Sequence, residues 1–75
     1  MQNRIDEILK KQGKKYADLV PLTGLSDYGI GKMARGDDDE NLGAWFSVAR
    51  ALHVSPAYLV GWSDKEEEQS FVEKQ

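Results

Sequence analysis

The sequence predicts an all-α protein, a compact bundle of five short helices, and three observations support this fold class. Apolar residues recur at helical spacing, as Ile5, Ile8 and Leu9 do. Glycines such as Gly13 and Gly36 stand where these periodic segments end, which is typical of a helix C-terminus. Serine or asparagine precedes other segments, at the position where a side chain caps the first turn.

The first two helices are expected over residues 2–12 and 15–22. The first buries the stripe of isoleucine and leucine just named, and the second buries Leu19 and Val20. Pro21 has no N–H and clashes with the preceding turn. The second helix therefore either ends early or is distorted over its last turn.

The third helix is expected to begin after the N-cap Ser26 and to end at Gly36. Ile30 and Met33 form its buried side. Its interior glycines are Gly29 and Gly31. Each of them lowers helix stability by about 1 kcal/mol relative to alanine, so this helix depends on tertiary packing or on a ligand.

The fourth helix is expected to begin after Asn41 and to reach about His53. Its broad apolar face contains Leu42, Trp45, Phe46, Ala49 and Leu52. The fifth helix is capped by Ser55, has Pro56 in the first turn, where proline is tolerated, and ends before Gly61.

A chain of 75 residues is long enough for one small domain, which we predict over residues 1–62. Residues 63–75 are expected to form a charged tail or linker that could be partly helical. The absence of cysteine excludes disulfides and thiolate zinc sites. No apolar run is long enough to span a bilayer and no signal peptide is recognisable, so we expect a cytoplasmic protein without membrane contact.

The net charge of −3 is unevenly distributed. Seven basic and four acidic residues give residues 1–36 a net charge of +3, whereas three basic and nine acidic residues give residues 37–75 a net charge of −6. A basic patch on one face sets the local field, so the N-terminal half is the half suited to a nucleic acid.

That basic half also has the spacing of a helix-turn-helix between Lys15 and Arg35. Leu19, Gly24 and Ile30 lie five and six residues apart, which two short helices need to cross with a glycine at the corner. Such a unit exposes the outer face of its second helix, a geometry best known for entering the DNA major groove.

Residues 13–60 resemble the Cro/lambda-repressor-type (Xre-like) helix-turn-helix family of phages and bacteria. The resemblance rests on Leu19, Gly24, Leu25-Ser26, Ile30, Met33, Arg35-Gly36 and the segment from Ala49 to Leu59. Tyr16 departs from the pattern, standing where many members have a glutamine, and an acidic run at residues 37–40 replaces a loop that is often basic.

The resemblance implies a sequence-specific DNA-binding transcriptional regulator, a phage or prophage-type repressor. It would bind a near-palindromic operator in double-stranded DNA as a homodimer. It also implies the residues that contact base edges, which are Asp27, Tyr28, Gly29 and Lys32. The alternative for this helix is an ordinary solvent-facing surface.

The candidate phosphate contacts are Lys14, Lys15, Tyr16, Arg35 and Asn41, with Arg4 as a further candidate. Asn41 is first a helix cap, and Arg4 is at least as well explained as a solvated surface residue. The family commonly dimerises through its last helix and the residues after it, so the candidate interface residues here are Tyr58, Trp62 and Phe71.

No catalytic or metal-binding pattern is found, and we expect neither an enzyme nor a cofactor or small-molecule ligand. His53 is a lone histidine, and the acids at 37–40 lack the alternation of a calcium loop. A second function remains open, in which the same fold is a protein-interaction module, antirepressor-like or antitoxin-like, that binds through its acidic loop and tail.

Overall fold

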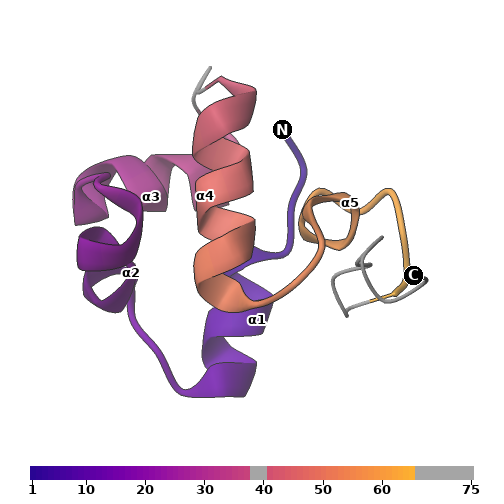
Figure 1. Cartoon of the computed structure of the whole chain (residues 1–75), viewed down its shortest axis with the longest axis horizontal. Helices are drawn as coiled ribbons and strands as arrows, with labels where there is room; N and C mark the ends of the chain where they lie inside the picture. The colour runs from indigo at the N-terminus through magenta and orange to yellow at the C-terminus, as the bar shows by residue number, and fades with distance from the viewer. Residues whose placement is uncertain (38–40, 66–75) are drawn as a thin grey trace, which may run out of the picture.

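The computed structural model describes residues 1–37 and 41–65, and within them the chain forms five α-helices and no strand. They are α1 (Ile5–Gln12), α2 (Tyr16–Thr23), α3 (Asp27–Arg35), α4 (Leu42–Leu52) and α5 (Pro56–Leu59). α2 and α3 lie on one side of α4, and α5 lies on the other side (Figure 1). The compact all-helical architecture confirms the predicted fold class. None of the described helices is long and apolar enough to cross a membrane.

The core is formed by apolar side chains from all five helices and from the link between α4 and α5. The largest fully buried side chains are Ile5, Ile8, Leu19, Ile30, Met33, Leu52, Leu59, Val48 and Val54. Full burial of one such side chain contributes about 1.5–3 kcal/mol, so the core stabilises the arrangement in which α2 contacts both α3 and α4.

The corner between α2 and α3 is a turn of residues 24–26. Gly24 has a φ of 76°, a left-handed conformation that glycine adopts without steric cost. Ser26 then caps α3, as predicted, because its hydroxyl accepts a hydrogen bond from the N–H of Gly29 at 2.9 Å. At the end of α4 the same left-handed conformation is taken by His53, with a φ of 62°, which the sequence did not indicate.

The first two helices begin later than predicted. α1 begins at Ile5 instead of residue 2, because the side chain of Asn3 is hydrogen-bonded to the end of α3. The side chain of Asn3 donates to the carbonyl of Met33 at 2.9 Å and accepts from the N–H of Ile5 at 3.0 Å. α2 begins after Lys15, whose N–H donates to the carboxylate of Asp18 at 2.9 Å.

α2 continues through Pro21 to Thr23, so of the two alternatives for this helix the early end is ruled out. The carbonyl that loses its usual partner is that of Ala17, four residues before the proline. Ala17 and Pro21 are both exposed, so water can hydrate this carbonyl. The last turn is fastened by Thr23, whose hydroxyl donates to the carbonyl of Leu19 at 2.8 Å.

The apolar face of α4 is narrower than predicted. Trp45 is buried as expected, but Leu42 and Phe46 are 62% and 53% exposed. These two residues are one helical turn apart and form a separate stripe, which lines a hollow together with residues of α5 and of the segment after it.

Candidate nucleic-acid interface

The four predicted base-contacting residues all lie on α3, away from its buried side. Asp27 and Tyr28 are exposed, the latter to 71%, while Gly29 and Lys32 are half-buried. The ammonium of Lys32 lies 5.7 Å from the centroid of the Tyr28 ring, one turn away along the helix. The helix thus presents an anion, an aromatic ring and a cation to solvent within two turns.

Tyr16 joins three helices on the inner side of α3. Its ring packs against Gly31, where an added Cβ would lie 3.3 Å from Cε2 of the ring and 3.4 Å from Nη1 of Arg35. Its hydroxyl donates a hydrogen bond to the carboxylate of Asp6 on α1. The hydrogen bond to Asp6 is the largest cause of a raised pKa of Tyr16, and partial burial is the second. Tyr16 therefore braces α3, and its hydroxyl already has a partner within the chain.

The lysines at the start of α2 border a shallow depression of about 350 Å³. The residues that line it are Asp6, Leu9, Lys10, Lys14, Lys15 and Tyr16. The structure thus brings together three of the five predicted phosphate contacts. Lys10 of α1 lies in the same group.

Arg35 and Asn41 lie at helix ends. Arg35 is close to the first turn of α2, since its Nη1 and the Tyr16 ring both approach Gly31. Its Nε lies 3.5 Å from Asp37, and both side chains are more than half exposed. Such a surface pair is worth little, so a phosphate can replace it. Asn41 is confirmed as the cap of α4, because its Oδ1 accepts from the N–H of Ala44 at 3.0 Å.

Arg4 is neither a solvated surface residue nor available to a phosphate. Its Nη1 donates to the carbonyls of Tyr58 and Ser63 at 2.9 Å each, and its guanidinium carbon lies 4.2 Å from the centroid of the Tyr58 ring. Asp64 lies 3.6 Å from the same guanidinium. Arg4 therefore fastens the chain after α5 to the N-terminus, a role that the sequence did not reveal.

The predicted dimer-interface residues differ in how far they are exposed. Tyr58 is half-buried beneath Arg4, whereas Trp62 is 80% exposed. Phe71 lies outside the described residues, as do residues 38–40 of the acidic loop and most of the tail. The structure adds Leu42 and Phe46, which sequence analysis assigned to the core and which lie with Trp62 on one apolar surface.

Among residues 1–37 and 41–65, no three histidine, aspartate or glutamate side chains lie together as metal ligands would. No protein-family model, no curated protein and no solved structure matches the chain significantly.

Proposed function

We propose that this chain is a sequence-specific DNA-binding transcriptional regulator, a repressor of the phage or prophage type. The observation that supports it best is the exposed face of α3, where Tyr28 and Lys32 lie one turn apart, opposite the buried Ile30 and Met33. In this proposal α2, the turn and α3 act as a helix-turn-helix, and α3 lies in the major groove of double-stranded DNA.

The side chains on that face have the chemistry to distinguish bases. Asp27 accepts a hydrogen bond from the amino group of cytosine, and Lys32 donates to O6 and N7 of guanine. Tyr28 packs on the methyl group of thymine or donates to a phosphate. Gly29 has no side chain, which lets the helix backbone approach the groove closely.

The basic group at the start of α2 supplies contacts that orient the protein without reading sequence. Lys14 and Lys15 border the depression beside Tyr16, and Arg35 reaches the same end of α2 from α3. Their positive charges bind consecutive phosphates along the edge of the groove in which α3 lies.

The proposed active form is a cytoplasmic homodimer on a near-palindromic operator, which represses by occluding the polymerase. Its two α3 helices lie about 34 Å apart, one turn of DNA. The exposed Trp62 follows α5, which lies across α4 from α3, so a second copy bound there leaves α3 free (Figure 1).

A salt titration with a random-sequence duplex tests the phosphate contacts. Affinity is expected to fall steeply with salt, and replacement of Lys14 and Lys15 by alanine is expected to reduce the slope of log K against log salt by about 0.9 per lost contact. The control is Arg50→Ala, which removes one positive charge from an exposed residue of α4 outside the proposed interface and should leave the slope unchanged. No binding even at low salt would overturn the proposal.

A further inference from the structure

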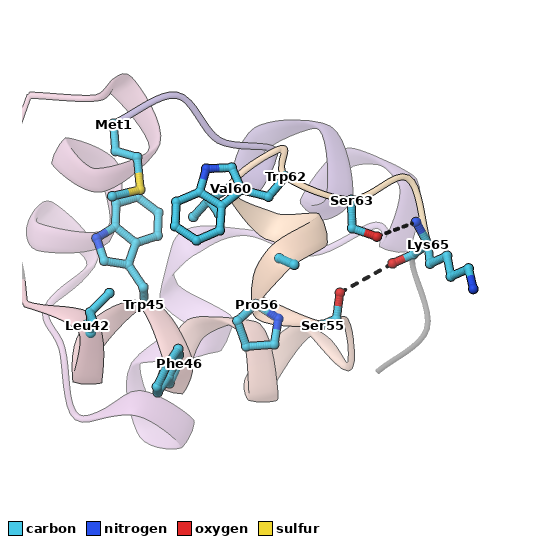
Figure 2. A pocket seen from close by; sticks show the side chains of 11 residues that line it. Met1, Leu42, Trp45, Phe46, Ser55, Pro56, Val60, Trp62, Ser63 and Lys65 are labelled. Atoms are coloured by element: carbon cyan, nitrogen blue, oxygen red, sulfur yellow. Dashed lines mark hydrogen bonds between the residues drawn. The ribbon is translucent and has the colours of Figure 1, made fainter. Parts of the chain in front are cut away.

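An apolar groove of about 470 Å³ runs between α4 and the segment that contains and follows α5. The side chains that form most of it are Leu42, Trp45, Phe46, Pro56, Val60 and Trp62. Figure 2 shows the α4 side chains facing those of Pro56, Val60 and Trp62 across the hollow. No α3 residue lines the groove, and α3 lies on the side of α4 opposite to α5 (Figure 1), so the groove is distinct from the proposed DNA surface.

Exposed apolar side chains gather at this groove. The large hydrophobic residues that are exposed in the described parts of the chain are Met1, Leu22, Tyr28, Leu42, Phe46 and Trp62. Four of these six line the groove. A contiguous patch of this kind, unlike single scattered residues, marks a surface that something covers.

The last residue that the structure describes, Lys65, lies at the rim of the same groove. The hydroxyl of Ser55 donates to the carbonyl of Lys65 at 3.3 Å, and Arg4 holds the carbonyl of Ser63 and the carboxylate of Asp64. Ser55, Ser63 and Lys65 themselves line the groove. These bonds fix the point from which residues 66–75 begin.

Residues 66–75 contain two apolar side chains, the adjacent Phe71 and Val72. They come six and seven residues after Lys65, and six residues of extended chain reach up to about 20 Å. We propose that Phe71 and Val72 dock into this groove of their own chain and cover Trp62 and Phe46. This inference does not depend on DNA binding.

Covalent attachment favours the chain's own tail over a second copy. A linker of a few residues gives the tethered segment an effective concentration of order millimolar, well above that of a second copy present at a micromolar concentration. A second copy that uses Trp62 as its interface must first displace the tail. Docking of the tail therefore opposes dimerisation, and operator binding favours the undocked form.

The accessibility of the Trp62 indole in the full chain tests the proposal. Trp45 is 3% exposed and Trp62 is 80% exposed, so Trp45 serves as an internal reference for the fold. The two indole N–H signals in an NMR spectrum are assigned with Trp62→Phe. Broadening of the Trp62 signal by a soluble paramagnetic agent is expected to increase severalfold when Phe71 and Val72 are both replaced by serine. The matched control, Gln69→Ser with Lys74→Ser, should behave as the parent chain does.

A spin label distinguishes the chain's own tail from that of a second copy. The chain contains no cysteine, so Ser70→Cys provides a single attachment site. The label is expected to broaden the signals of Leu42 and Phe46 equally at all dilutions, and to leave them sharp in an unlabelled chain mixed with it. Equal Trp62 accessibility in the parent and the serine variant would overturn the proposal, and so would broadening that appears only in the mixture or only at high concentration. Neither readout involves DNA, so a failure here leaves the proposed function standing.

Discussion

The aromatic ring of Tyr16 in α2 lies directly against the backbone of Gly31 in α3. A Cβ added at residue 31 would stand 3.3 Å from Cε2 of the ring, closer than side-chain atoms normally pack. Tyr16 also donates a hydrogen bond to Asp6, which ties α1 to the same contact. Gly31, which weakens α3 as an isolated helix, is thus the residue that lets α2 approach it.

A double-mutant cycle measures this contact. In the parent chain, Gly31→Ala gains up to about 1 kcal/mol of helix propensity but forces the Tyr16 ring to move. In a Tyr16→Ala background the ring is absent, so the same substitution is expected to be more favourable by about 1 kcal/mol. Denaturant unfolding of the four proteins gives this coupling energy. Gly29→Ala is the control, since its Cβ would meet Ser26 and not Tyr16. Equal effects of Gly31→Ala in both backgrounds would show that the contact is not formed.

Tyr16→Phe removes the hydrogen bond to Asp6 and makes stability respond to alkaline pH. The substitution is expected to cost about 1 kcal/mol at neutral pH. Because the pKa of Tyr16 is raised above its ordinary value of about 10, the unfolded chain loses the proton before the folded chain does. The contribution is fully present below pH 10 and is lost as the pH rises through the raised pKa. The free energy of unfolding of the parent should therefore fall relative to Tyr16→Phe above pH 10.

The control for this prediction is Asp6→Asn, which removes the carboxylate whose hydrogen bond and charge raise the pKa of Tyr16. In the Asp6→Asn background, the difference in free energy of unfolding between the chains with tyrosine and phenylalanine at residue 16 should change less above pH 10. A divergence of the same size with and without the carboxylate would contradict the assigned cause.

Arg4→Lys keeps the positive charge but is expected to destabilise the chain by about 1–3 kcal/mol, because an ammonium cannot hold two carbonyls while stacking on Tyr58. Thermal or denaturant unfolding gives the difference. Arg50→Lys changes an exposed arginine on α4 in the same way and should stay within about 0.5 kcal/mol of the parent. DNA affinity should be equal in both variants, since neither residue belongs to the proposed interface. A stable Arg4→Lys with weakened DNA binding would return Arg4 to the phosphate contacts.

The caps of α3 and α4 and the buried side of α3 could be predicted from the sequence because their causes are local. Ser26 and Asn41 are caps within three residues of the N–H groups they bind, and Ile30 and Met33 follow the helical period. The start of α1 could not be predicted, because it depends on Asn3 reaching a carbonyl at the end of α3, 30 residues away.

The surroundings of Arg4 and Phe46 were also predicted wrongly, because they too depend on residues far away in the sequence. Arg4 finds its partners more than 50 residues along the chain, and no pattern in the sequence indicates such a pairing. Phe46 has the spacing of a core residue on α4, yet periodicity does not say how wide a face its neighbours cover. An exposed stripe beside Trp62 becomes visible only once α5 is placed.

The most direct test of DNA reading by α3 is selection of the full chain against a pool of random DNA duplexes. The account predicts an enriched two-fold symmetric motif with half-sites about one helical turn, roughly 10 base pairs, apart. Replacing Lys32 by alanine should then cost about 1–3 kcal/mol on that motif, whereas Arg50→Ala, at an exposed residue of α4, should bind as the parent does. If the pool yields no enriched sequence, or if Lys32→Ala together with Tyr28→Ala binds the motif as tightly as the parent, α3 does not read DNA. The acidic loop and tail would then be the surface on which to seek a protein partner.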